Sequence, residues 1–298
     1  MHGLPLSIEP MSFAGLRVLS LESRRAKEIE TLILRHEGRP FVAPSVKERA
    51  LDDHGEALRF VERLEADEFD MVICMTGTGI AFLRDTLASQ MPVERLGAAL
   101  RRATIVSRGP KPVGILRTLG VPVEIMIGEP NTWKEIVEAV AARPERRIAV
   151  QEYGRPNREM NAALEALGAS VAPMAIYRWE LPDDLEPLRE AVRKLAARQV
   201  DVVLFTSSIQ LDHLFEVART LSLETDVKGA LTEDVAVASV GPVMTASLEA
   251  QGIIPAIIPL HPKMPGLVKA AAEQAGALLA ARRVNRVTGR TGHNDTRV

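Results

Sequence analysis

The segment Ser107-Arg108-Gly109-Pro110 recurs in the chain as Ser239-Val240-Gly241-Pro242, and this repetition decides the fold. A leucine and then a glycine follow both segments at the same distances, so the offset between the two copies stays at 132 residues. A period of this length is far longer than the roughly 20–50 residues of solenoid repeats. The repeat therefore predicts two similar domains within one chain.

Apolar strands precede both copies. Val72–Thr76 aligns with Val202–Thr206 at an offset of 130 residues. Each copy reads as an apolar strand, a polar turn, helices, a second apolar strand, the Gly-Pro turn, a helix that ends at a glycine, and a further strand. Strands that alternate with helices are typical of parallel, doubly wound sheets. The expected fold class is α/β, with two similar doubly wound parallel-sheet domains joined by a two-stranded linker, one domain inserted into the other.

The first predicted strand and helix, Leu16–Gly38, have no counterpart at the head of the second copy, whereas the middle of the chain contains a complete set. The economical topology assigns this pair to the C-terminal half of the chain. We therefore expect a discontinuous domain at 12–38 plus 180–282, an inserted domain at 47–171, an interdomain linker at 39–46 and 172–179, and a flexible, arginine-rich tail at 283–298. Both linker segments look extended and carry proline, so they could pair as a two-stranded hinge that allows relative motion of the domains.

Composition excludes several classes of function. Because 37 basic residues nearly balance 39 acidic ones, no global field would attract nucleic acid or a membrane surface. The start of the chain lacks the pattern of a signal peptide, and no apolar run approaches the roughly 18 residues of a spanning helix. The single cysteine, Cys74, lies in an apolar strand, which favours a buried, inert thiol and a reducing cytoplasm. We expect a cytoplasmic monomer, because the ligand site would be internal to one chain.

Polar turns follow the predicted strands, where parallel α/β domains usually bind ligands. Glycines allow close backbone approach, and hydroxyls and cations there suit carboxylates or phosphates. Each turn is also consistent with helix capping or solvated charge. The candidate substrate-binding residues are Thr76, Thr78, Ser107, Arg108, Lys111, Gly154, Arg155, Arg158, Thr206, Ser207, Ser208 and Gly241.

Common motifs for metal, nucleotide and nucleophile chemistry are missing from the sequence. The turn Thr76–Gly79 lacks the lysine and spacing of a P-loop, and no G-x-G-x-x-G follows the first strand. The histidines are scattered without metal-ligand spacing, and no G-x-S-x-G elbow occurs. No metal and no cofactor are expected. Tyr177 lies in the second predicted linker segment, where both hinge packing and a functional hydroxyl remain open.

Taken together, the chain resembles the uroporphyrinogen-III synthase family over about residues 13–280. The resemblance is carried by Phe205–Ser208, by Ser239-Val240-Gly241-Pro242 running through Leu248 to Gly252, by Tyr153-Gly154 and Arg158-Glu159 through Gly168, by Ile176-Tyr177 and by Pro262-Lys263 with Leu267-Val268. It implies a cofactor-free cyclising lyase that closes hydroxymethylbilane, a linear tetrapyrrole with eight carboxylates, into the type III ring through a spiro intermediate. It also implies that Tyr177 is the acid for the leaving hydroxyl.

Two departures from the family pattern affect individual residues. Val243 and Met244 follow the second Gly-Pro pair where relatives have threonines, and Thr245 comes one step later, so we expect only backbone contacts from this turn. Met75–Gly79 replaces a Thr-Ser type of turn. The alternative function is a non-catalytic, two-lobe ligand-binding or regulatory protein of the same fold.

Overall fold

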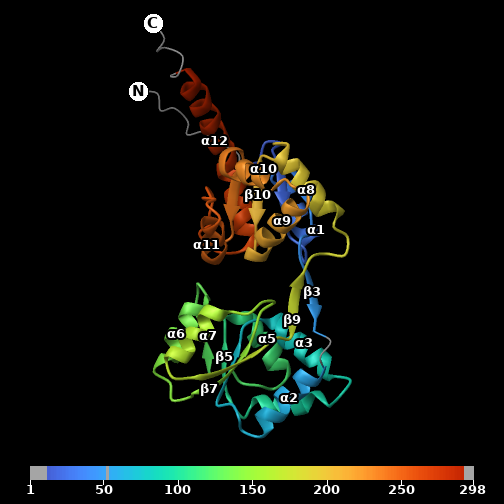
Figure 1. Cartoon of the computed structure of the whole chain (residues 1–298), viewed down its shortest axis with the longest axis vertical. Helices are drawn as coiled ribbons and strands as arrows, with labels where there is room; N and C mark the ends of the chain where they lie inside the picture. The colour runs from blue at the N-terminus through green and yellow to red at the C-terminus, as the bar shows by residue number, and fades with distance from the viewer. Residues whose placement is uncertain (1–11, 52–53, 292–298) are drawn as a thin grey trace, which may run out of the picture. The chain divides into compact units, whose positions relative to one another are not determined.

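The computed structural model describes residues 12–51 and 54–291, and its internal contacts divide the chain into two units. Unit 1 combines the residues up to Lys47 with those from Leu181 onward, and unit 2 is Glu48–Glu180. Unit 1 therefore contains the first and last parts of the chain, drawn in blue and in yellow to red in Figure 1. Each unit contains its own parallel sheet and buried clusters, so the predicted α/β fold class is confirmed.

Unit 2 is built on a parallel sheet with five strands in the order β6-β5-β4-β7-β8. The central strand β4 is buried at all four positions, and its alternate residues Val72 and Ile73 enter two different apolar clusters. A strand buried on both faces is what a doubly wound sheet requires. The elements are α2 (His54–Glu65), β4 (Met71–Cys74), α3 (Gly77–Leu87), α4 (Val93–Leu100), β5 (Thr104–Ser107), α5 (Pro110–Thr118), β6 (Ile125–Met126), α6 (Trp133–Ala141), β7 (Arg147–Gln151), α7 (Arg158–Ala166) and β8 (Ser170–Met174).

Unit 1 has a parallel sheet with four strands in the order β11-β10-β1-β2. Its central strands are also buried, and its helices cover two apolar clusters, one on each face. The elements are β1 (Arg17–Ser20), α1 (Ala26–Arg35), β2 (Arg39–Val42), α8 (Glu186–Ala196), β10 (Val202–Phe205), α9 (Ser208–Thr220), α10 (Glu224–Gly229), the π-helix η1 (Ala230–Asp234), β11 (Ala236–Ser239), α11 (Pro242–Ala250) and α12 (Met264–Thr291).

The two sheets have the same register but a different order along the chain. Val106 pairs with Ile125 beside β5, and Ala238 pairs with Ile257 beside β11, again 132 residues further on. The first strand of the chain, β1, lies beside β10 as β7 lies beside β4. Unit 1 is thus a permuted version of unit 2, in which the first strand and helix of the chain complete the sheet.

An aspartate–arginine clamp supports this equivalence. Asp70 precedes β4 and accepts hydrogen bonds from the backbone N–H and the Nε of Arg147, the first residue of β7, each at 3.1 Å. Asp201 precedes β10 and accepts the same two kinds of bond from Arg17, the first residue of β1, at 2.8 Å and 2.9 Å. The paired arginine lowers the pKa of Asp70 to about 2 and that of Asp201 below its ordinary value.

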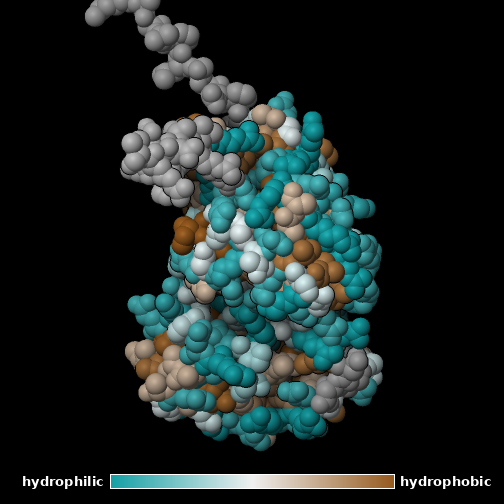
Figure 2. All heavy atoms as spheres, turned by 45° about the horizontal axis from the view of Figure 1, so that its top comes forward, coloured by the Kyte–Doolittle hydropathy of each residue, from teal (hydrophilic) through white to brown (hydrophobic). Residues whose placement is uncertain are grey.

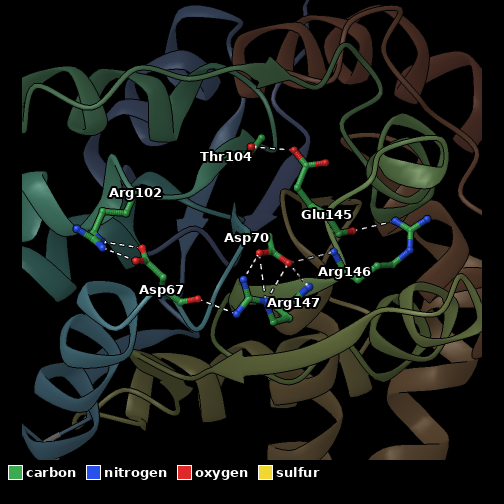
Figure 3. A network of polar contacts seen from close by, with 7 residues as sticks. All are labelled: Asp67, Asp70, Arg102, Thr104, Glu145, Arg146 and Arg147. Atoms are coloured by element: carbon green, nitrogen blue, oxygen red, sulfur yellow. Dashed lines mark hydrogen bonds and ion pairs between the residues drawn. The ribbon is translucent and has the colours of Figure 1, made fainter.

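Figure 3 shows the surroundings of the clamp in unit 2. Asp67 binds Arg102, its carbonyl accepts a hydrogen bond from Arg147, and Thr104 donates to Glu145 at 2.8 Å. These residues lie at the amino ends of β4, β5 and β7. The network therefore ties neighbouring strands together at the edge opposite the predicted ligand-binding turns.

The linker prediction was wrong in its details. Within the predicted segment 39–46, Arg39–Val42 forms β2 and pairs in parallel with β1, and residues 172–174 of the second predicted segment belong to β8. The two-stranded pair is formed instead by β3 (Lys47–Ala50) and β9 (Tyr177–Glu180). Proline accounts for the error, because Pro40 and Pro173 lie in edge strands, where a missing N–H is tolerated.

The tail predicted at 283–298 overlaps helix α12. Helix α12 continues to Thr291, and residues 292–298 lie outside the described residues. Arg282 donates from its Nη1 to the carbonyl oxygen of Val235 at 2.7 Å, which fixes the helix to unit 1. Arginine is a good helix former, so a basic stretch can continue a helix that an apolar stripe has begun.

Candidate active site

The turn after β4 begins with Thr76, which caps helix α3. Its Oγ1 accepts a hydrogen bond from the N–H of Gly79 at 3.0 Å, and its own N–H donates to Oε1 of Gln151 at 3.1 Å. The two glycines that follow are required by packing. A Cβ on Gly77 would lie 2.7 Å from the Lys111 carbonyl oxygen, and one on Gly79 would lie 2.0 Å from Nε2 of Gln151.

The turn after β5 is shaped by Ser107, whose side chain is fully buried. Its Oγ donates to the carbonyl oxygen of Gly109 at 2.7 Å, and Gly109 has the φ of +94° that favours glycine. The N–H of Arg108 donates to the Cys74 carbonyl at 3.0 Å. The Ser107 hydroxyl is therefore used inside the turn.

The side chain of Arg108 extends over the ring of Tyr153, with Cζ 4.7 Å from the ring centroid. Within residues 12–51 and 54–291 it has no carboxylate partner. Partial burial lowers the pKa of Arg108, and the nearby Tyr153 and Tyr177 act in the opposite direction. This arginine is a half-buried cation held by an aromatic face rather than by an acid.

Tyr177 is the first residue of β9 and is only 3 % exposed. Its hydroxyl lies 3.3 Å from Oγ1 of Thr76, and its ring centroid lies 5.5 Å from that of Phe82. The sequence leaves open whether this tyrosine packs or functions. In the structure it does pack, and its hydroxyl has a polar partner at the carboxyl edge of the sheet.

The loop after β7 brings two more aromatic residues to the same edge. Gly154 has a φ of +67°, and a Cβ there would lie 2.3 Å from Cδ2 of Trp179. The rings of Tyr153 and Trp179 meet edge-on at 5.7 Å. Neither aromatic residue is among the predicted site residues, because an aromatic side chain near the end of a strand is equally consistent with a place in the hydrophobic core.

Glu152 is a buried carboxyl group in this loop. It is 5 % exposed, and its Oε1 has no hydrogen-bond partner within the described part of the chain. Burial raises the pKa of Glu152, which favours its neutral form. Glu152 directly follows Gln151, which accepts a hydrogen bond from Thr76. The sequence pattern does not distinguish Glu152 from a solvent-exposed glutamate in a turn.

The equivalent turn of unit 1 has a different arrangement. Thr206 donates from Oγ1 to Oε2 of Glu22 at 2.5 Å and accepts from Nε2 of Gln210 at 2.7 Å. Ser207 is the N-cap of α9, and Ser208, the first residue of that helix, is buried. The Thr206 hydroxyl therefore makes two hydrogen bonds within its own unit.

The second turn of unit 1 repeats the buried serine of unit 2. Ser239 donates from Oγ to the Gly241 carbonyl at 3.1 Å and accepts from Oγ1 of Thr245 at 2.9 Å. A Cβ on Gly241 would lie 2.9 Å from Cβ of Pro262. Thr245, displaced by one position from the family pattern, thus braces the turn.

Apart from Ser107, whose hydroxyl is used inside its own turn, the predicted residues divide into three groups. In unit 2, Thr76 lies next to Tyr177 and Arg108 lies over the ring of Tyr153, and we call these four residues the tyrosine cluster. Gly154 contacts this cluster through Trp179. Thr78 is half-buried in the first turn of α3, whereas Lys111, Arg155 and Arg158 are exposed; the unit 1 residues Thr206, Ser207, Ser208 and Gly241 form their own turns.

Two further features bear on the class of site. In the parts of the chain that the structure describes, no three His, Cys, Asp or Glu side chains are grouped so that they could hold a metal ion. Cys74 is buried, as predicted, and burial raises the pKa of its thiol to about 12. None of the described helices is long and apolar enough to cross a membrane, and hydrophilic side chains predominate on the face shown in Figure 2.

Polar turns and the cation Arg108, at the carboxyl edge of a parallel sheet, are typical of α/β proteins that bind small ligands there. The sequence model of the family described as uroporphyrinogen-III synthase HemD matches residues 27–269. The chain therefore belongs to the uroporphyrinogen-III synthase family, whose members are cyclising lyases.

Known proteins resemble the chain over most of its length. It is 28 % identical to the uncharacterized protein YjjA of Bacillus subtilis, over 85 % of this chain and 94 % of that protein. It is 29 % identical to a Methanothermobacter thermautotrophicus protein named "Putative uroporphyrinogen-III synthase", over 77 % of this chain and 87 % of that protein. A crystal structure of a mutant uroporphyrinogen III synthase from the extremely thermophilic bacterium Thermus thermophilus has the same fold, with a TM-score of 0.69, 22 % identity, and coverage of 89 % of this chain and all of that one.

Proposed function

We propose that this chain closes hydroxymethylbilane to uroporphyrinogen III, with Tyr177 as the acid that protonates the leaving hydroxyl. The observation that carries the proposal is the tyrosine cluster. In a member of this family, it supplies a phenol whose oxygen lies 3.3 Å from the Thr76 hydroxyl. A positioned acid of this kind contributes typically about 10²–10⁴-fold to a rate.

The reaction begins when the Tyr177 O–H gives its proton to the substrate hydroxyl. The carbon–oxygen bond then breaks, water leaves, and the electron pair of the adjacent pyrrole stabilises the cationic methylene. Attack on this methylene by the substituted carbon of the terminal ring gives the spiro intermediate, which fragments and recloses with that ring inverted. Since closure without inversion also occurs spontaneously and gives the type I isomer, the protein acts mainly by positioning the reacting carbons.

Recognition of the substrate carboxylates falls to residues at the carboxyl edges of the sheets. In unit 2 we assign charge pairing to Arg108 and to the exposed Lys111, Arg155 and Arg158, because guanidinium and ammonium groups bind carboxylates well. Hydroxyl and backbone contacts are assigned to Thr76, Thr78, Ser107 and Gly154 in unit 2, and to Thr206, Ser207, Ser208 and Gly241 in unit 1. For Ser107 the assignment concerns its backbone, since its hydroxyl donates to Gly109.

The experiment is an isomer assay on Tyr177→Phe, with hydroxymethylbilane generated in situ and the oxidised porphyrins separated by chromatography. We expect the rate of type III formation to fall by about 10²–10⁴-fold, so that spontaneously formed type I dominates. The matched control is Thr104→Val, which removes a hydroxyl at the opposite edge of the same sheet. An unchanged type III rate in Tyr177→Phe would exclude the acid role.

The same assay on the unmodified chain separates the catalytic proposal from the ligand-binding or regulatory alternative. Type III product supports the synthase, whereas type I alone, at the rate of the blank, would favour a protein that has kept the fold but not the chemistry. We further infer that the chain acts as a monomer in the cytoplasm. Light scattering during size-exclusion chromatography would contradict the monomer if it gave twice the chain mass of 32.5 kDa.

A further inference from the structure

A glutamine side chain binds the N-cap residue of a helix in both units, but the two glutamines come from different elements. In unit 1, Gln210 is the third residue of α9, and its Oε1 accepts a hydrogen bond from the N–H of the N-cap Ser207 at 3.4 Å. In unit 2 the N-cap of α3 is Thr76, and its N–H donates at 3.1 Å to Oε1 of Gln151, the last residue of β7. The same kind of contact is thus made from within the helix in unit 1 and from a strand in unit 2.

Gly79 shows that this difference is built into the packing. It is the third residue of α3, so by its place in the helix it is the counterpart of Gln210. A Cβ on Gly79 would lie 2.0 Å from Nε2, 2.3 Å from Cδ and 2.7 Å from Oε1 of Gln151. The amide of the fully buried Gln151 therefore fills the space where a side chain at position 79 would begin.

The amide nitrogens of the two glutamines also bind different groups. In unit 1, Nε2 of Gln210 donates to the hydroxyl of Thr206 at 2.7 Å. In unit 2, Nε2 of Gln151 donates to the carbonyl oxygen of Glu152. Gln151 therefore takes up the N–H of Thr76 but not its hydroxyl, and it joins the turn after β4 to the loop after β7.

The hydroxyl of Thr76 lies between the N–H of Gly79 and the phenol of Tyr177. Its Oγ1 accepts a hydrogen bond from Gly79 at 3.0 Å and lies 3.3 Å from the Tyr177 oxygen. A threonine hydroxyl has one hydrogen to donate, and a phenolate oxygen only accepts. Once Tyr177 has given its proton to the substrate, the Thr76 O–H is placed to donate to the phenolate. The quality of this bond depends on where the turn holds Thr76.

We propose that Gln151 is a positioning residue for the proton transfer by Tyr177, because its amide fixes the turn that keeps the Thr76 hydroxyl beside the phenol. This inference rests on the proposed function. Gln151 is buried and acts through Thr76. It adds no reactant to the reaction, since Tyr177 regains its proton when the newly closed pyrrole carbon loses its hydrogen.

The first test is the kinetics of Gln151→Leu, which removes the amide and keeps an apolar side chain of similar size. We expect kcat for type III formation to fall by about tenfold with less than about a threefold change in KM, because the phenolate exists only after proton transfer. Gln90→Leu, at an exposed position of the same unit, is the control and should leave both constants unchanged. An unchanged kcat in Gln151→Leu, or a rise in KM alone, would overturn the inference.

A double variant separates a positioning role from general support of the site. In the Tyr177→Phe background, Gln151→Leu should change the type III rate by less than about twofold, because the phenol through which the glutamine acts is gone. If the two losses multiply instead, Gln151 acts independently of Tyr177 and the inference is wrong. Gln151→Met takes the place of Gln151→Leu in both tests if the latter does not fold, as judged by urea unfolding.

The repeat itself offers a rescue. In Gln151→Ala the atoms nearest to a Cβ on Gly79 are removed, so Gly79→Gln can be added to return the glutamine to the helical position that it has in unit 1. We expect the double variant to recover kcat to within about threefold of the unmodified chain, since the Thr76 N–H regains an acceptor. A folded double variant as slow as Gln151→Ala would contradict the role of this bond.

The two proposals fail in different ways. An unchanged type III rate in Tyr177→Phe overturns the proposed function. A slow Tyr177→Phe combined with a normal kcat in Gln151→Leu overturns this inference alone and leaves the proposed function standing.

Discussion

Thr76 and Thr206 lie in the equivalent turns of the two units, after β4 and after β10, and their hydroxyls have different partners. In unit 1 the Thr206 hydroxyl binds Glu22 and Gln210. In unit 2 the Thr76 hydroxyl caps α3 and lies next to the phenol of Tyr177. The turn is present in both units, but in unit 2 its threonine hydroxyl lies beside a phenol, a group that can transfer a proton.

The next turn shows the same division. The buried serine, its bond to the glycine carbonyl and the proline that starts the helix are retained in both copies. The residue between them is Arg108 in unit 2 and Val240 in unit 1. Backbone-shaping positions are thus shared between the units, and the positions that carry charge differ.

The largest expected effect concerns aromatic packing, in which the two units differ. The loop after β7 in unit 2 contains Tyr153, whereas the equivalent turn after β1 in unit 1, Leu21–Arg24, contains no aromatic residue. Gly154→Ala should cost about 2–4 kcal/mol of unfolding free energy, because the methyl group meets Trp179 and the φ is positive. Urea denaturation measures the loss.

Gly168→Ala is the matched control for Gly154→Ala. Its φ is +84°, but no atom lies within 4 Å of the added Cβ, so about 1 kcal/mol is expected. Equal losses in the two variants would show that backbone conformation, and not the Trp179 contact, makes glycine necessary at position 154.

The second prediction tests whether the amino edges of the two units are as alike as they look. Asp70→Asn and Asp201→Asn should each cost about 1–2 kcal/mol at pH 7, after allowance for solvent screening of these half-exposed pairs. Because the folded-state pKa of both acids is lowered, their contribution is present at neutral pH. It is lost as the pH falls below about 4, through the value of about 2 for Asp70.

Urea unfolding at pH 7 and at pH 3 measures both clamps, and the deficit of each variant should be smaller at the lower pH. Both tryptophans, Trp133 and Trp179, lie in unit 2, so fluorescence follows that unit while circular dichroism follows both. The Asp85 side chain is 61 % exposed and pairs with its neighbour Arg84. Asp85→Asn should therefore change the free energy of unfolding by less than about 0.5 kcal/mol. If the losses of unfolding free energy in Asp70→Asn and Asp201→Asn differ by more than about 2 kcal/mol, the two clamps are not equivalent.

The smallest effects separate the two threonines. Thr206→Val should lose about 1 kcal/mol of stability, because Glu22 and Gln210 each lose a hydrogen-bond partner. Thr76→Val should lose about 0.5–1 kcal/mol through its cap and should also slow type III formation about threefold, since the phenolate oxygen loses a donor. A larger rate loss in Thr206→Val than in Thr76→Val would reverse the comparison.

Much of the fold could be predicted because its signals are local. The apolar strands, the Gly-Pro turns and the need for β1 to complete unit 1 all follow from residue patterns along the chain. The strand partners of Pro40 and Pro173 could not be predicted in this way, since a proline in an edge strand looks like a linker until its neighbour is known. Helix α12 extends into the predicted tail, and its contact through Arg282 with Val235 joins residues that are distant in sequence.

The positions of Thr76 and Arg108 in the turns after β4 and β5 could be predicted, because turn chemistry is explicit there. The direction of the Ser107 hydroxyl was not, because it depends on the left-handed backbone of Gly109. The packing of Tyr153 against Trp179 could not be predicted either. Their role depends on a meeting between the loop after β7 and strand β9, which no local spacing encodes.

The permuted order of unit 1 has a consequence for how the chain is made. Val18 pairs with Val202, so the first strand leaves the ribosome 184 residues before its partner exists. At a synthesis rate of about 5–20 residues per second, this interval is roughly 10–40 s. Unit 2, which is continuous in sequence, can fold within that interval. During the same time β1 and β2 lack their partner β10, so their apolar side chains remain exposed. Unit 1, whose first strand is made before unit 2, is thus finished after it.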